Sequence, residues 1–190
     1  MGKVIVETDR LRLRCWTDEL KAEFVRHLNT PAVMRWLGGV QDQAAYDAGF
    51  ERIESYQREH GHTLWAVERK VDGALLGFCG LKRVNSAGAP NPGDFEVGWR
   101  LREDAWGKGY AKEAAIASLD LAFGKFGAPH VVALTVTGNE VSQGLMKRLG
   151  MTRHPCLDFE STDPWAGSES VIVYRLAAEH WPAARAAALA

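Results

Sequence analysis

One segment, residues 96–113, constrains this chain more than any other. It reads EVGWRLREDAWGKGYAKE, which is a strand pattern, then a loop with two glycines, then a helical pattern. The first amides of a helix lack partners within the helix, and the helix dipole adds partial positive charge at that end. Glycine lets an anion approach the backbone closely, and Lys108 and Lys112 add cationic groups. The segment therefore predicts a phosphate-binding loop, with a pyrophosphate as the expected ligand.

Two well-known nucleotide-binding motifs do not fit this loop. No Gly-Lys-Ser/Thr follows at P-loop spacing, and GKGYAKEA lacks the third glycine of the dinucleotide-binding fingerprint. These mismatches disfavour a nucleotide-binding regulator. A tight turn that needs glycine only for its backbone conformation is the simpler alternative explanation of the pattern.

Hydrophobic periodicity predicts one α/β domain, residues 1–190, with a mixed sheet. The length suits a single domain with a full core, and no internal repeat or domain linker interrupts it. The expected strands cover residues 11–15, 63–68, 75–84, 95–101, 131–136 and 171–176, and the expected helices cover about 17–28, 43–60, 111–126 and 140–149. A short apolar turn is expected at 33–37, and a C-terminal helix at 177–190 is expected to be broken near Pro182.

The composition excludes several classes of partner and site. A net charge of −1 disfavours nucleic acid as the main partner. No apolar run is long enough to cross a bilayer, and the N-terminus does not resemble a signal peptide, so we expect a cytoplasmic protein that does not bind membranes. Cys15, Cys79 and Cys156 are scattered and odd in number, so neither a disulfide framework nor a zinc site is expected. No other metal-binding motif is present, and we expect no metal.

A second motif occupies residues 139–151, NEVSQGLMKRLGM. It has the pattern of a capped helix, with Asn139 as the N-cap, Leu145 and Leu149 as an apolar stripe and Gly150 as the C-cap. An N-cap residue can also place its side chain against a ligand, so the structural and functional interpretations are compatible.

The two motifs together resemble those of the GNAT superfamily of N-acetyltransferases. Gly109 and Ala111 match its Gln/Arg-x-x-Gly-x-Gly/Ala loop, whereas Trp106 stands at the Gln/Arg position. The runs WGKGYAKEA, FEVGWRL and TDRLRLRCWT are similar to the RimJ/RimL-like branch, and residues 139–151 are similar to the family's Asn-x-x-Ser-x-x-Leu-x-x-x-Leu-Gly-Phe. The resemblance covers about Thr8 to Leu176. Two such motifs in the right order are far more specific than either alone.

The resemblance implies an α+β fold, with a mixed, mostly antiparallel sheet flanked by helices, and acetyl-CoA as cosubstrate. It implies that Trp99, Arg100 and Leu101 flank the pantetheine. The residues implied to hold the phosphates are Gly107, Lys108, Gly109, Tyr110, Ala111 and Lys112, and Asn139 is implied to contact the cofactor. The acceptor would be a primary amine, either a protein or peptide N-terminus or a small molecule.

The chemistry then needs a base for the amine, hydrogen bonds to the developing oxyanion and a group near the departing sulfur. Glu96, on the strand before the loop, is our candidate base, although a solvated or salt-bridged strand carboxylate is an equally good interpretation. Asp94, Asp158 and Glu160 are weaker alternatives. The oxyanion donor is expected to be a backbone amide of the same strand, near Trp99 or Arg100.

Ser142 is our candidate for the contact with sulfur. Many members of the family place a tyrosine on this helix, where this chain has Met146. A serine hydroxyl is a poor acid, so Ser142 is expected only to hydrogen-bond the sulfur. The alternative function is a catalytically silent module that still binds acyl-CoA. A homodimer stays open, as do the acceptor and the acyl-chain preference.

Overall fold

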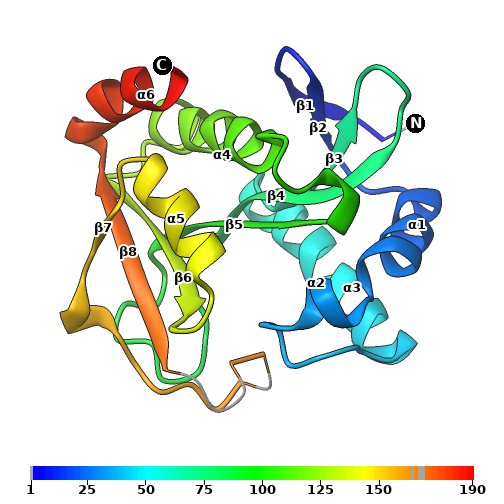
Figure 1. Cartoon of the computed structure of the whole chain (residues 1–190), viewed down its shortest axis with the longest axis horizontal. Helices are drawn as coiled ribbons and strands as arrows, with labels where there is room; N and C mark the ends of the chain where they lie inside the picture. Colours follow the sequence, from blue (N-terminus) through cyan, green and yellow to red (C-terminus); the bar gives the residue numbers. More distant parts are fainter. Residues whose placement is uncertain (1, 164, 167–169) are drawn as a thin grey trace. The chain divides into compact units, whose positions relative to one another are not determined.

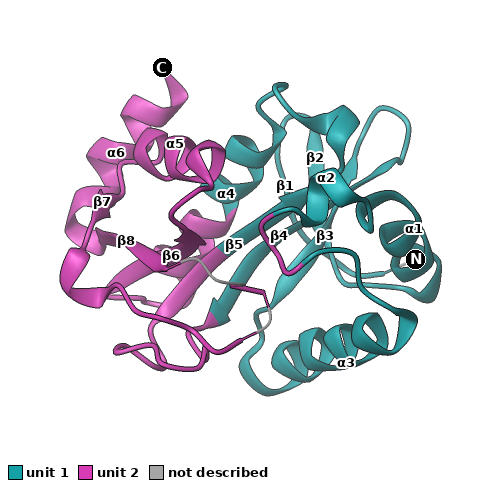
Figure 2. Cartoon of the chain, turned by 60° about the horizontal axis from the view of Figure 1, so that its bottom comes forward, with its two compact units in different colours: residues 1–35, 39–82, 98–117 teal, residues 36–38, 83–97, 118–190 magenta. Residues whose placement is uncertain are grey.

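The computed structural model describes residues 2–163, 165–166 and 170–190. The chain separates into two compact units, shown in teal and magenta in Figure 2. The first unit contains residues 1–35, 39–82 and 98–117, and the second contains residues 36–38, 83–97 and 118–190. The two units are described separately below.

The first unit is built on antiparallel strands, visible in Figure 1. Its strands are β1 (Val4–Glu7), β2 (Leu11–Arg14), β3 (Leu64–Arg69), β4 (Leu75–Arg83, except its last residue) and the end of β5 (Phe95–Leu101). Neighbouring strands from β1 to β4 pair antiparallel in chain order. The end of β5 also lies close to β4, since a Cβ on Gly77 would come within 2.0 Å of the Arg100 carbonyl oxygen.

Three helices pack on this strand layer: α1 (Asp18–Leu28), α2 (Pro31–Met34) and α3 (Gln43–His60). Thr17, Thr30 and Asp42 cap their N-termini through side-chain oxygens, as polar N-cap residues do. The shared core is mostly aromatic and aliphatic, and consists of Trp16, Leu20, Phe24, Leu28, Val33, Tyr46, Phe50, Ala66 and Leu75. The first residues of α4 (Tyr110–Asp120) also belong to this unit.

The second unit contains the start of β5, then β6 (His130–Val136), β7 (Thr152–Arg153) and β8 (Val171–Ala177). The start of β5 pairs parallel with β6, whereas β8 pairs antiparallel with both β6 and β7. A π-helical turn at Leu121–Lys125 follows α4, and the remaining helices are α5 (Glu140–Arg148) and α6 (Trp181–Leu189). Val84, Val132 and Val173 form one of its apolar clusters.

The mixed, mostly antiparallel sheet with flanking helices is the predicted fold class, and it is confirmed. Each predicted strand and helix is present. The strand at 95–101 and the helix at 43–60 have the predicted ends, and the others have shifted ends. The strands β1 and β7, of four and two residues, were not predicted. A single domain over residues 1–190 stays a prediction.

Three local predictions were wrong. Residues 31–34 form the helix α2, with Pro31 in its first turn, so only residues 35–37 of the apolar turn expected at 33–37 lie in a turn. The helix expected to reach Phe126 ends at Asp120 and continues as the π-helical turn. Pro182 does not break the last helix but lies in its first turn, where a missing N–H costs no hydrogen bond.

In the described part of the chain, no helix has both the length and the apolar character needed to span a membrane. All three cysteines are free thiols.

Candidate active site

The predicted phosphate loop has the backbone conformation that its glycines allow. Gly107 and Gly109 have φ values of 71° and 79°, in the left-handed region that other residues avoid. Both are exposed, as is Lys108 between them. The N–H of Glu113 bonds the carbonyl of Gly109 at 3.0 Å, so the amides of residues 110–112 precede that helical bond. The loop therefore presents exposed glycine backbone and a lysine beside the start of α4.

Trp106 anchors the loop to the strand before it. Its indole Nε1 donates a hydrogen bond of 2.7 Å to the carbonyl of Leu101, the last residue of β5. The residue is nevertheless 49% exposed, so it is not a core tryptophan. The residue at the family's Gln/Arg position here fixes the loop against the strand that is predicted to flank the pantetheine.

Arg10 and Glu113 hold the loop from the other side, and sequence reasoning missed this pair. Arg10 Nε and backbone N donate to Glu113 at 2.6 and 2.9 Å, and Thr8 Oγ1 donates to the same carboxylate at 2.5 Å. Arg10 Nη1 also donates to the Lys108 carbonyl at 3.0 Å, and its guanidinium lies 4.6 Å from the centroid of the Tyr110 ring. Both residues fall in motifs that resemble the family's, but their contact spans 103 positions.

The ionisation of Glu113 follows from this set of contacts. Partial burial acts to raise the pKa of its carboxyl, but the hydrogen bonds from Thr8 and Arg10, with the Arg10 charge, together lower the pKa below its ordinary value. Glu113 is therefore a structural carboxylate that stays charged, and it is not a candidate base.

The strand residues predicted to flank the pantetheine occupy the end of β5 in the same unit. Leu101 is buried, while Trp99 and Arg100 are partly exposed. The Arg100 guanidinium lies among aromatic rings of the helical layer, 5.2 Å from the centroid of Phe78 and 5.9 Å from that of Phe24. The structure thus brings the strand end and the phosphate loop together, through the Trp106 bond to Leu101.

The other predicted residues belong to the second unit. Glu96 lies in β5, opposite Val132 of β6, and is 7% exposed. Asn139 caps α5, and its Oδ1 accepts from the Ser142 amide at 3.3 Å. The Ser142 side chain is half-buried, and its hydroxyl bonds no other described residue. Met146 is buried in the core, so the helix offers no acid at that position.

The three weaker base candidates have other partners. Asp94 accepts from Asn91 at 3.0 Å and contacts His130 Nε2 at 2.9 Å, and these contacts outweigh burial and lower its pKa. Asp158 forms an ion pair with Arg153 and accepts from the Val173 amide. Glu160 accepts from Ser170 at 2.5 Å. Each of these carboxylates already has a structural role.

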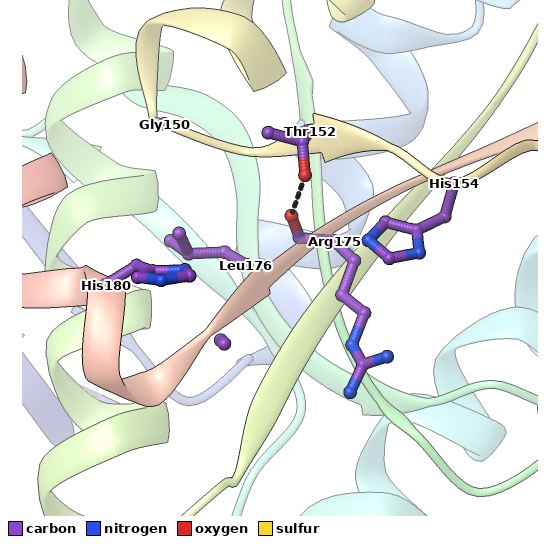
Figure 3. A pocket seen from close by; sticks show the side chains of 7 residues that line it. Gly150, Thr152, His154, Arg175, Leu176 and His180 are labelled. Carbon is purple, nitrogen blue, oxygen red and sulfur yellow. Dashed lines mark hydrogen bonds between the residues drawn. The ribbon is translucent and has the colours of Figure 1, made fainter.

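A pocket of about 260 Å³ lies in the second unit (Figure 3). It is lined by Gly150, Thr152, His154, Arg175, Leu176, Ala177 and His180. No predicted site residue lines it. Its Arg175 contacts His130 Nδ1 at 3.2 Å and so belongs to the Asp94 network. Among the described residues, no group of three or more potential metal ligands gathers in one place.

Comparisons with known proteins bear on both motifs. A family model described as "Acetyltransferase (GNAT) domain" matches residues 10–152. The chain is 33% identical over 151 residues to the uncharacterized protein YkkB of Bacillus subtilis (strain 168), covering 79% of this chain and 86% of that protein. It is 32% identical over 117 residues to FsC-acetyl coenzyme A-N(2)-transacetylase of Aspergillus fumigatus, covering 58% of this chain and 49% of that protein.

A solved structure agrees with the sequence relatives. The crystal structure of an acetyltransferase from Agrobacterium tumefaciens str. C58 is similar with a TM-score of 0.74 and 26% identity, covering 90% of this chain and 92% of that one. The chain belongs to the GNAT acetyltransferase family, in its RimJ/RimL-like branch. It is an acetyl-CoA-dependent N-acetyltransferase, as the motifs predicted.

Proposed function

We propose that this enzyme transfers the acetyl group of acetyl-CoA to a primary amine, and that residues 107–112 hold the pyrophosphate. The observation that carries the proposal is the exposed, left-handed pair Gly107 and Gly109 directly before the first turn of α4. A phosphate can approach such a backbone without meeting a Cβ, and it meets the positive end of a helix. Lys108 adds charge, and the Trp106 and Arg10 bonds hold the loop in place.

In the reaction the amine nitrogen attacks the thioester carbonyl carbon, the C–N bond forms and the C–S bond breaks. The amine must lose a proton, and the departing thiolate gains one. We assign the first task to Glu96, directly or through water, because it lies on the strand that leads into the phosphate loop. We assign a hydrogen bond to the sulfur to the Ser142 hydroxyl, and the oxyanion to a backbone amide near Trp99 or Arg100.

The acceptor is a protein or peptide N-terminus or a small-molecule amine. A panel of amines and peptides incubated with acetyl-CoA, with release of the free CoA thiol measured, tests the proposal. Acetyl transfer to at least one primary amine is expected. Binding of acetyl-CoA without thiol release from any acceptor would instead identify the silent acyl-CoA-binding module.

The base assignment predicts a specific pH behaviour. Glu96→Gln keeps the shape of the side chain but removes its basicity, so turnover should fall about 10²–10⁴-fold with little change in acetyl-CoA affinity. High pH should partly restore the rate, since the amine then deprotonates unaided. Ser142→Ala should lose less activity and show no such rescue. Wild-type rates for Glu96→Gln across the pH range would place the base elsewhere, and Asp94→Asn and Asp158→Asn would be tested next.

A further inference from the structure

Arg100 differs from the other arginines whose charge is withdrawn from solvent. The clearest comparison is Arg14, which is buried and forms an ion pair with Glu68. Arg100 forms no ion pair with any described carboxylate, and its Nε, like that of Arg14, is buried without a hydrogen-bond partner. Its side chain contacts the Met34 Sδ, 3.5 Å from Nη1, and hydrogen-bonds Tyr46. Sulfur is only a weak acceptor, and neither partner is an anion.

The surroundings of Arg100 compensate its charge only in part. The rings of Phe24 and Phe78 lie within 6 Å of the guanidinium and provide cation–π attraction. Tyr46 hydrogen-bonds the same group, but burial outweighs the charge and the hydrogen bond of Arg100 and raises the pKa of its phenol, so Tyr46 supplies no negative charge. Withdrawing a cation from water is costly unless an anion pairs with it. A guanidinium without a paired anion is suited to a planar carboxylate, which it can hold by two parallel bonds.

The place of Arg100 in the chain connects it with the chemistry. It precedes Leu101, whose carbonyl accepts the Trp106 bond that anchors the phosphate loop. Its side chain is directed towards the layer of α1, α2 and α3, while part of the residue remains exposed. An anion bound there lies beside the strand that the family resemblance implies flanks the pantetheine.

We propose that Arg100 binds a carboxylate group of the acceptor, so that the preferred acceptors are amino acids or other amino carboxylates. The inference rests on the proposed acetyl transfer and names its substrate class. In this role Arg100 determines specificity, whereas Glu96 accepts the amine proton.

The test uses the full chain, acetyl-CoA and matched acceptors, each amino acid being paired with its own amide. Thiol release gives kcat/KM for each member of a pair. The wild type should prefer the acid over the amide, and Arg100→Met should remove that preference by lowering kcat/KM for the acid about 10- to 100-fold, the usual range for losing a hydrogen-bonded charge. Its kcat/KM for the amide should fall far less than that for the acid.

Two further variants separate recognition from packing. Arg102→Met removes a cation two residues further along the chain. Arg102 pairs with Asp104, so this variant should leave the acid–amide preference intact. Arg100→Lys keeps the charge without the planar fork and should retain part of the preference. Because withdrawing an unpaired cation from water is costly, replacing Arg100 by an apolar side chain removes that cost, and Arg100→Met should not lower the melting temperature of the free enzyme.

The outcomes distinguish this inference from the proposed function. If the wild type acetylates acids and amides equally, or acetylates only amines without a carboxylate, the Arg100 assignment is wrong and acetyl transfer stands. Equal losses on acid and amide in Arg100→Met, with a lower melting temperature, would show that Arg100 is purely structural. If no amine of any kind releases thiol, the proposed function fails, and this inference fails with it.

Discussion

Glu113 shows how much one side chain contributes to the phosphate loop. It receives hydrogen bonds from Thr8 and from both the backbone and side chain of Arg10, and Arg10 also holds the carbonyl of Lys108. The loop conformation is thus determined partly by a turn that lies about one hundred positions earlier. The side chain of Glu113 is only 17% exposed, so its bonds are little screened by solvent.

We expect Glu113→Gln to destabilise the protein by about 1–2 kcal/mol at pH 7, because a neutral amide replaces a charged acceptor. The folded-state pKa of Glu113 lies below the ordinary 4.5, so its contribution is complete above about pH 5 and is lost as the pH falls through the lowered pKa. Urea denaturation of both proteins between pH 7 and pH 3 measures this. A difference that is constant over that range, or absent at pH 7, would contradict the role assigned to the carboxylate.

Among the elements, those with strong periodic patterns could be predicted from the sequence, and the short ones could not. The strand β6 is a β-branched run and α5 carries its own caps, so both are encoded locally. The strands β1 and β7 are too short to show a period, and they form because β2 and β8 offer them partners. The prediction of a break at Pro182 was wrong because a proline is compatible with either a helix break or the first turn of a helix. The helix begins at Trp181, so Pro182 lies in its first turn.

The candidate site also has parts that are encoded locally and parts that depend on distant residues. The glycine loop was evident because its residue types are required by backbone conformation. The contacts of Arg10 with Glu113 and of Arg100 with Met34 join residues 103 and 66 positions apart, and no local pattern encodes them. Arg100 was expected only to flank the cofactor. Its aromatic surroundings could not be predicted, because they depend on the packing of α1 and β4 around it.

The loop between β5 and α4 allows a matched glycine test. Gly109→Ala and Gly73→Ala both place a Cβ at positive φ, 79° and 70°, and Gly73 lies in the turn between β3 and β4. Each should cost about 1–2 kcal/mol in stability. Only Gly109→Ala should also weaken CoA binding, by about tenfold or more, because the added methyl group obstructs the phosphate. Calorimetric titration checks this, and equal CoA affinities for the two variants would exclude the loop as the phosphate site.

At the scale of the whole molecule, the expectation of a single domain can be tested by asking whether the chain unfolds cooperatively. The strand β5 and the helix α4 each begin in one compact unit and end in the other, so the two units share these elements. Units that share a strand and a helix should not unfold independently, since melting one would disrupt hydrogen bonds of the other. We therefore expect one calorimetric transition for the free enzyme, with equal calorimetric and van't Hoff enthalpies.

Ligand binding should move that single transition as a whole. A ligand that binds only the native state, at about 100 times its Kd, adds about 2.7 kcal/mol of stability. For a chain of this size each kcal/mol raises Tm by about 2–4 °C, so acetyl-CoA should raise Tm by about 5–11 °C. ATP and NAD should not, because the loop lacks both of their motifs. Differential scanning calorimetry with each ligand is the measurement. Equal stabilisation by ATP would count against a CoA-specific loop, and two transitions, of which acetyl-CoA shifted only one, would show that the units fold separately.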